Sequence, residues 1–363
     1  MPLLVFCLVL AFVPWWPDGA HAPRWVLLSV AVPVLLFTIQ RVSWTPGHFC
    51  LGGFLLWGLA SFWWTPDLLL GADIYWHFLL FGGLFLLAPS AMHPVYVAAG
   101  LALCINSLTT VLQVLQVVEW EASTFYSGLF FNKNLSAEVA ALAIVGLVVG
   151  ARPTLCRSSL AIGASVPLLT LPLSRGAILA LVSAGWLVLW RRAKFAAALV
   201  AVVAIGISAH FLTLKVATLS ERLEIWGRAW DGLSLWGNGL GSFRFDHPFF
   251  EYAHNDFLQV AYELGLPGVL LLATFFGYCL WRGAIAERLV IVVFLVEGLF
   301  AFPLYMPVTL AIVALAAGSL CRARVAVRGV QRVGERRDYA REAAERREAS
   351  IAAFWKSSGP VPF

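Results

Sequence analysis

Long apolar runs separated by short polar segments fill the chain from Met1 to Leu320. A helix that crosses a bilayer needs roughly 20 apolar residues, or somewhat fewer where other helices shelter its ends. By this measure we expect about twelve membrane-spanning helices, within residues 1–16, 24–40, 48–64, 72–90, 94–116, 134–150, 157–172, 176–190, 195–212, 257–281, 287–303 and 304–320. No run alternates with the two-residue period of an outer-membrane strand. The pattern therefore predicts an all-α polytopic integral membrane protein.

Two stretches depart from the apolar pattern. Residues 212–256 are largely polar and form an expected outer loop of about 40 residues between the ninth and tenth helices. Residues 321–363 mix basic and acidic side chains at helical spacing, which indicates an amphipathic tail on the inner membrane surface or a solvated helix. We therefore divide the chain into a transmembrane domain, residues 1–320, and a basic tail. Residues 1–22 also allow a cleaved signal peptide, although no basic residue precedes their apolar run.

Composition and charge narrow the class. The 363 residues are 61% hydrophobic and 12% charged, which excludes an ordinary soluble globular domain. Most of the 25 Lys and Arg residues lie inside if both termini are inside, as the positive-inside rule requires. The net charge of +5 is carried by the tail and does not indicate a nucleic-acid-binding surface. Cations remain at the outer boundary: Arg24, Lys133, Arg175, Lys215, Arg222, Arg228 and Arg244. These cations are expected either to bind an anionic ligand or to pair with acids such as Glu221 and Glu224, and the sequence leaves both interpretations open.

The outer loop contains two groups of residues that could take part in binding or catalysis. Arg222, Trp226 and Trp230 are spaced four residues apart, so a short helix aligns one guanidinium and two indoles. Such a face suits a phosphate beside a sugar, or a helix lying on the bilayer with Trp anchors. His254 precedes Asn255 and opens an apolar helical run, where an imidazole can serve as a general base or simply as a polar terminus.

Glu263, nine residues beyond His254, lies deep enough in the helix to need a partner or a function.

Two other features of the loop region argue against a metal site and a nucleotide site. The acids and histidines between Asp246 and Asp256 match no compact zinc pattern, so we expect no metal. The GNGLG run from Gly237 to Gly241 follows no buried strand and is interpreted as a turn rather than a phosphate loop.

Four segments, taken in order, resemble the O-antigen ligase and polymerase superfamily of bacterial C-type membrane glycosyltransferases. They are GLFFNKNLSA with Asn132 and Asn134, LSRGA with Arg175, the Arg222-to-Trp226 pair followed by GNGLGSF, and HNDFLQVAYELGLPG. The last segment is similar to the family's H-[NS]-x-x-L and E-x-G-x-x-G signature and is the most specific. The motifs cover roughly residues 120–275, and residues 1–115 carry none of them.

The resemblance implies transfer of a preassembled glycan from undecaprenyl pyrophosphate to lipid A core or another glycolipid, with inversion and without metal, nucleotide sugar or other cofactor. It also implies a bacterial inner membrane, an active site facing the periplasm and both termini in the cytoplasm. The residues that match the family's motifs take roles by the same resemblance. Arg175, Arg222 and Arg228 bind the pyrophosphate, His254 acts as the base, Asn255 and Glu263 fix its imidazole, and Asn132, Asn134 and Trp226 line the substrate site.

Several alternatives remain. Two of them are an oligosaccharyltransferase that acts on protein and a non-catalytic envelope scaffold, in which His254 and the arginines could be replaced without consequence. A polymerase differs from a ligase only in its acceptor, which is another lipid-linked repeat. A transporter or flippase belongs to another class and also needs about twelve helices, but it places ionisable groups near the middle of the membrane. Glu297 is the only acid that we expect in the middle of a helix.

Overall fold

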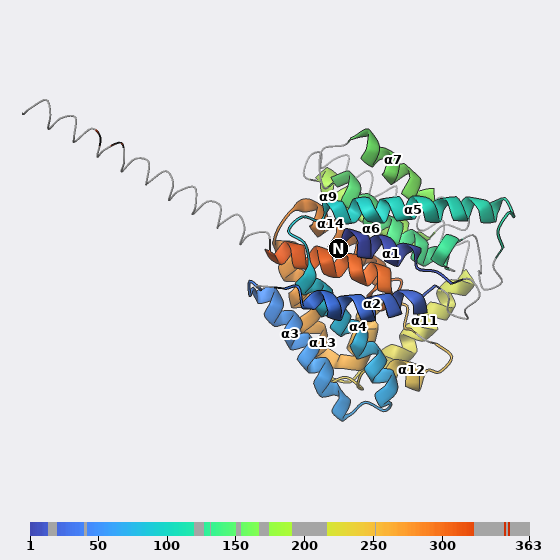
Figure 1. Ribbon diagram of the computed structural model, residues 1–363. Helices are drawn as coiled ribbons and strands as arrows, with labels where there is room; N and C mark the ends of the chain where they lie inside the picture. The colour runs from blue at the N-terminus through green and yellow to red at the C-terminus, as the bar shows by residue number, and fades with distance from the viewer. Residues whose placement is uncertain are drawn as a thin grey trace, which may run out of the picture. The chain divides into compact units, whose positions relative to one another are not determined.

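The computed structural model describes residues 1–13, 20–39, 42–119, 127–130, 132–149, 154–166, 174–190 and 216–322 except residue 251, and in the tail only residues 345 and 348. Regular structure within these residues is entirely helical, which confirms the all-α class (Figure 1). The helices are α1 (Pro2–Leu10), α2 (Ala22–Leu36), α3 (Pro46–Ala60), η1 (Ser61–Trp63), α4 (Leu68–Leu87), α5 (His93–Val114), η2 (Gly128–Phe130), α6 (Lys133–Val149), α7 (Leu155–Ala164), α9 (Arg175–Trp190), α11 (Val216–Asp231), α12 (Ser242–Asp246), α13 (Asp256–Trp281), α14 (Ile285–Gly298), η3 (Pro303–Tyr305) and a last helix, Pro307–Arg322.

A helix overlaps each expected spanning segment except residues 195–212, which lie outside the described residues. Helices α4, α5 and α13 are long and apolar enough to cross a membrane, and α2, α6, α9 and the last helix are apolar but shorter. These helices give the chain the make-up of a membrane protein. The expected outer loop is itself partly helical, since it contains α11 and α12.

Helices distant in sequence pack against one another around a single apolar core. Helix α5 contacts α1, α6 and α7, while α13 contacts α3, and α14 contacts both α6 and α9. Residues 1–321 form one compact unit, and the tail from Arg322 onward forms a second. The first unit contains every candidate site residue.

Helix starts near the site are fixed by side-chain caps. The Asp67 carboxylate accepts hydrogen bonds from the backbone N–H groups of Leu69 and Leu70 at 2.8 and 3.1 Å, which begins α4. Asn255 Oδ1 accepts from the Leu258 N–H at 3.0 Å and begins α13 in the same way. Both caps satisfy N–H groups that a helix leaves without internal partners.

Helix α13 is interrupted where its sequence reads Gly265-Leu266-Pro267. Gly265 has φ +64°, and Pro267 has no N–H, so the helical hydrogen bonds around them are lost. The carbonyls of Tyr262, Glu263 and Leu264 instead accept from Asn238 N, Gly239 N and Trp57 Nε1, at 2.9, 2.9 and 2.8 Å. Interrupted helices at membrane depth need such substitute donors.

The GNGLG segment supplies two of these three donors, Asn238 N and Gly239 N, because its glycines permit close backbone contact. Gly237, Gly239 and Gly241 all have φ between +79° and +92°. A Cβ on Gly237 would lie 2.3 Å from the Glu263 carbonyl oxygen, and one on Gly239 would lie 2.5 Å from Thr65 Cα. The segment therefore packs its backbone against α13 and against the turn before α4, which fits the expected turn.

Candidate functional site

The polar segment before α13 is built on a small apolar cluster of its own. Ile225 and Ala229 of α11 pack with Phe243, Ala253 and Tyr262, which joins α11 and α12 to the start of α13. The Tyr262 hydroxyl donates to Asp246 at 2.6 Å and adds a polar tie to the same cluster. This cluster packs α11 and α12 against α13.

Two hydrogen bonds hold the backbone immediately before His254. Trp226 Nε1 donates to the Ala253 carbonyl at 2.9 Å, and the Ala253 N–H donates to Gln259 Oε1 at 3.0 Å. The Trp226 indole, which the resemblance assigns to substrate binding, therefore anchors the peptide that carries His254.

His254 occupies a constrained position at the mouth of α13. Its φ is +51°, in the left-handed region that non-glycine residues adopt infrequently, and its ring packs on Phe302 with the centroids 5.1 Å apart. Burial, and after it the positive charge of nearby Arg222, lowers the pKa of the imidazole to about 4. The ring is thus neutral near pH 7 and has a free nitrogen lone pair for a proton.

Arg222 connects His254 to a second part of the chain. It lies on the face of α11 that also carries the buried Ile225 and Ala229, and it interacts electrostatically with both His254 and Glu138. Glu138 belongs to α6, directly after GLFFNKNLSA. The fold therefore brings Arg222 and His254 together and places the end of the Asn132 motif beside them.

Three helices contribute buried carboxyl groups near Arg222 and His254. Asp256 of α13 and Glu297 of α14 each interact electrostatically with Glu138 of α6. Asp256 Oδ2 accepts the Leu304 N–H at 2.9 Å, whereas neither oxygen of the fully buried Glu297 has a hydrogen-bond partner within the described part of the chain. Buried carboxyls in such surroundings are expected to have a function.

Glu263 acts on the His254 segment through Gln259. The carboxylate is fully buried, and its Oε1 accepts from Gln259 Nε2 at 3.3 Å. Gln259 in turn holds the Ala253 N–H, and Asn255 caps α13. In this arrangement Asn255 and Glu263 fix the backbone that carries the imidazole rather than the ring itself.

Arg228 lies apart from this arrangement. Its Nη2 donates to Glu224 Oε1 at 2.8 Å on a largely exposed face of α11, which is the acid pairing left open by the sequence. Trp230, two residues further along α11, is 69% exposed. Along α11, the side chains near Arg222 therefore pack against the rest of the protein, whereas Arg228 and Trp230 are exposed.

The asparagines of GLFFNKNLSA shape the start of α6. Asn132 Oδ1 accepts from the Asn134 N–H at 2.9 Å. The preceding Gly128 has φ +62°, and its N–H donates to Gln113 Oε1 at 2.8 Å, while the Leu129 N–H donates to Asn106 Oδ1 at 2.7 Å. Polar side chains of α5 thus fix the conformation of the turn that precedes α6, the helix that carries Glu138.

Arg175 begins α9, and its side chain lies outside the described residues. The next residue, Gly176, lies against the chain just after α14, where its Cβ position is 3.9 Å from Phe300 Cβ. Phe302, two residues beyond Phe300, supports the His254 ring. The backbone of the LSRGA motif therefore approaches the segment that supports His254.

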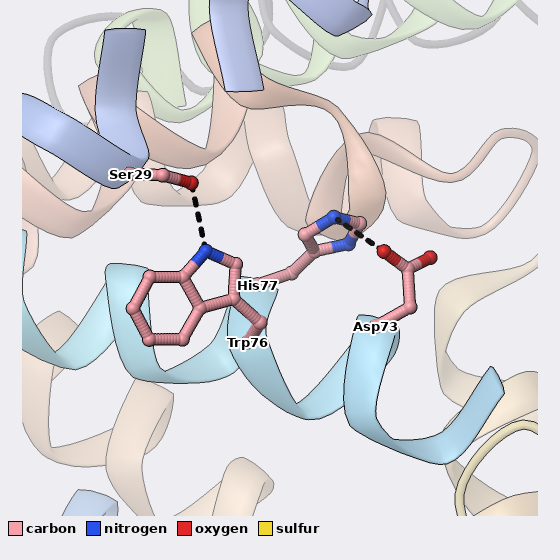
Figure 2. A network of polar contacts seen from close by, with 4 residues as sticks. All are labelled: Ser29, Asp73, Trp76 and His77. Atoms are coloured by element: carbon pink, nitrogen blue, oxygen red, sulfur yellow. Dashed lines mark hydrogen bonds and ion pairs between the residues drawn. The ribbon is translucent and has the colours of Figure 1, made fainter. Parts of the chain in front are cut away.

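Several polar residues of the site region were not singled out from the sequence. Asn106, Gln113 and Gln259 hold the turns described above, and Asp73 and His77 face one another on α4 (Figure 2). Their common signal is a polar side chain inside an otherwise apolar helix, which membrane proteins rarely carry without a reason.

Among the described residues, no three His, Cys, Asp or Glu side chains are arranged to hold a metal ion. No protein-family model matches the chain, and a search of curated proteins gives no match.

Proposed function

We propose that the protein is a membrane glycosyltransferase of the O-antigen ligase type. It transfers a preassembled glycan from undecaprenyl pyrophosphate to lipid A core or a similar glycolipid at the periplasmic face of a bacterial inner membrane. The observation that carries the proposal is the pairing of a neutral imidazole, His254, with a nearby guanidinium, Arg222, in an otherwise apolar chain. The proposal also rests on the four motifs and includes twelve spans with both termini in the cytoplasm.

The reaction needs a proton acceptor and a stabilised leaving group. The acceptor hydroxyl oxygen attacks the anomeric carbon, its proton passes to the free nitrogen of His254, and the bond from that carbon to the pyrophosphate oxygen breaks. The pyrophosphate stays on the polyprenyl chain with its added negative charge. A direct displacement of this kind inverts the anomeric centre.

In this proposal Arg222 stabilises the developing charge on the pyrophosphate, because a planar guanidinium donates two parallel hydrogen bonds to phosphate oxygens. Burial, and after it the positive charge of Arg222, lowers the pKa of His254 and keeps its imidazole unprotonated, so that it can accept a proton. The resemblance adds Arg175 to the same role, and Arg228 if the pyrophosphate displaces Glu224 from it.

The test is transfer by the purified protein with undecaprenyl-pyrophosphate-linked glycan, EDTA, and either lipid A core or no added acceptor. We expect product that depends on the core. His254→Ala should lower kcat by at least about 100-fold, the range for a lost general base. Arg222→Ala should cost about 100-fold or more, the range for a lost charge-stabilising donor. Full activity of His254→Ala in correctly inserted protein would contradict the role of the imidazole.

A polymerase is the alternative within the same chemistry. The same assay separates the two, since a polymerase lengthens chains in the absence of core. Residues 1–115, which carry no family motif, are the part of the chain in which a difference in acceptor is expected to reside.

A transporter is the second candidate function, and one observation favours it. Glu138, Asp256 and Glu297 are buried and lie within or at the end of helices, and Asp256 and Glu297 each interact electrostatically with Glu138, as proton-carrying groups in transporters do. If no transfer occurs under either condition of the assay, proton uptake by proteoliposomes, compared between the wild type and Glu297→Gln, tests this function directly.

A further inference from the structure

The end of α13 that is remote from His254 meets the ends of two other helices. Cys279 lies two residues before the end of α13, and Cys321 lies one residue before the end of the last helix. Gly47 lies in the first turn of α3, which packs side by side with α13 (Figure 1). Both cysteines are therefore within one turn of a helix end.

The thiols of Cys279 and Cys321 contact one another across these helix ends. The Cys279 thiol donates a hydrogen bond to Cys321 Sγ. The position of a Cβ on Gly47 lies 2.8 Å from Cys321 Sγ and 3.0 Å from Tyr278 Cδ1, so the Cys321 thiol and the residue before Cys279 surround the same glycine.

The chain just after Cys279 is also fixed against the last helix. Gly283 has φ +73°, and its Cβ position lies 3.2 Å from Leu320 Cα, next to Cys321. Arg288 donates from Nε and Nη2 to the Gly283 carbonyl at 3.1 and 2.6 Å and holds this turn. Contacts on both sides of Cys279 therefore bring the two thiols together, in addition to their own hydrogen bond.

The surroundings make the two sulfur atoms unequal. The hydrogen bond from Cys279 lowers the pKa of the Cys321 thiol, which lies just beyond the expected span 304–320. A hydrogen bond from the Thr45 hydroxyl and the positive charge of Arg282 act in the same direction, and burial opposes them. Donors and positive charge stabilise a thiolate, which is the reactive form of cysteine. Cys321 is therefore the nucleophile of the pair, and Cys279 is the thiol that keeps its proton.

Burial restricts which reagent can reach the pair. Cys279 is 0% exposed and Cys321 is 3% exposed. Glutathione and protein disulfides are too large to enter the folded protein here, whereas hydrogen peroxide is close to water in size. The pair lies at the expected inner side of the membrane, where thiols are kept reduced and disulfides are transient. A small oxidant and a reversible product fit both conditions.

We propose that Cys279 and Cys321 are a peroxide-reactive pair that forms a reversible disulfide between α13 and the last helix. The Cys321 thiolate attacks one oxygen of hydrogen peroxide, the O–O bond breaks, and the other oxygen leaves as water after taking a proton. The Cys279 sulfur then attacks the Cys321 sulfenic acid, and its proton leaves with the hydroxyl as a second water. The two thiols lose two electrons in total, and a dithiol reverses the reaction. Neither step involves the chemistry of the proposed function.

Peptide mass spectrometry of the purified, full-length protein tests the pair. The protein is treated with hydrogen peroxide, its remaining thiols are alkylated, and it is digested without reductant. We expect a linked peptide pair that contains Cys279 and Cys321 and disappears after treatment with dithiothreitol. Because a cross-link restricts the unfolded chain, peroxide should also raise the melting temperature of the wild type but not of Cys279→Ser.

Single variants assign the role of each sulfur. Dimedone, which traps sulfenic acids, is added together with denaturant after the peroxide step. In Cys279→Ser it should label Cys321, whereas in Cys321→Ser it should label Cys279 at least about tenfold less, because a buried neutral thiol reacts poorly. Cys50→Ser removes the nearby thiol of α3, which interacts electrostatically with Cys279, and should still form the linked pair. Alanine replaces serine in any variant that fails to fold.

A maleimide added before the peroxide controls for unfolding. It should label the exposed Cys156 but neither Cys279 nor Cys321 while the protein is folded. In protein that meets this condition, absence of the link between Cys279 and Cys321, or a link from Cys279 to Cys50 instead, overturns the proposal. Equal dimedone labelling of the two single variants overturns the assignment of Cys321 as the nucleophile.

Discussion

The proton affinity of His254 is set by the residues around its ring. Burial against Phe302 disfavours the charged imidazolium, and the Arg222 guanidinium disfavours it further, so the pKa of His254 falls to about 4. The neutral ring is present above that pH and is lost only as the pH falls through about 4. An unperturbed histidine would lose it near pH 6.5.

Chemical modification of His254 checks this expectation. Diethyl pyrocarbonate acylates imidazole only in its neutral form, so the rate of modification at His254, followed by peptide mass spectrometry, should stay high at pH 5. In Arg222→Gln the pH at half-maximal rate should rise, because a positive charge is removed, although burial remains. Glu221→Gln, an exposed change on the same helix, is the control. A half-maximal rate near pH 6.5 in the wild type would falsify the assignment.

Arg24 shows a different use of a buried guanidinium. It is fully buried and donates to the carbonyls of Leu8, Val9 and Leu129 at 2.8, 3.0 and 3.0 Å, with its guanidinium over the Phe130 ring. It thereby joins the end of α1 to the turn that precedes α6.

Loss of this side chain should therefore affect stability. Arg24→Met leaves two buried carbonyls and one partly buried carbonyl without their donor and should cost at least about 3 kcal/mol. Arg228→Met, an identical change at an exposed ion pair, should cost less than about 1 kcal/mol. Thermal unfolding in detergent, followed by labelling of the buried Cys279 and Cys321 thiols, compares the two. Equal stability of both variants would contradict the structural role of Arg24.

The same comparison shows how far sequence can predict a site. Arg24, Arg222 and Arg228 carry one signal, a cation at the outer boundary of an apolar chain. The structure gives them three environments: backbone carbonyls, the His254 and Glu138 pair, and an exposed ion pair with Glu224. The partners of Arg24 lie 15, 16 and 105 residues away, and sequence patterns do not encode such contacts.

At the scale of elements, apolar run length predicted where the helices lie but not how they end. Helix α1 stops at Leu10 rather than near residue 16, and the last two expected spans are joined through η3. The single span expected over residues 257–281 did not anticipate the break in α13 at Gly265 and Pro267. What could not be predicted is that the GNGLG turn, about 25 residues earlier, supplies two of the missing hydrogen bonds and Trp57 of α3 the third, because these pairings are tertiary.

The break depends on Gly265 and can be tested against a matched glycine. A Cβ on Gly265 would lie 2.4 Å from both Gly237 N and Leu235 O, at a φ of +64°. Gly265→Ala should therefore destabilise the protein by more than about 1 kcal/mol. Gly277, later in α13, has no atom within 4 Å of its Cβ position, so Gly277→Ala should stabilise by about 0.4–1 kcal/mol. Equal melting temperatures for the two variants would show that α13 does not need the break.

At the scale of the whole molecule, the proposed chemistry requires His254 and α11 to face the outside. Phe249 lies in the same segment, five residues before His254, and is 91% exposed. Cys156, at the start of α7, is exposed as well and falls in an expected inner loop. The two positions therefore report on opposite sides of the membrane under the twelve-span arrangement.

A membrane-impermeant maleimide applied to spheroplasts distinguishes the two sides. In a Cys156→Ser background, Phe249→Cys should be labelled in intact spheroplasts, because its segment leads into the outer end of α13. In the wild type, the Cys156 thiol should be labelled only after permeabilisation. Labelling of Cys156 from outside together with protection of Phe249→Cys would invert the orientation. The His254 and Arg222 pair would then face the cytoplasm, where lipid-linked glycans are built from nucleotide sugars, and transfer to a periplasmic acceptor would be impossible.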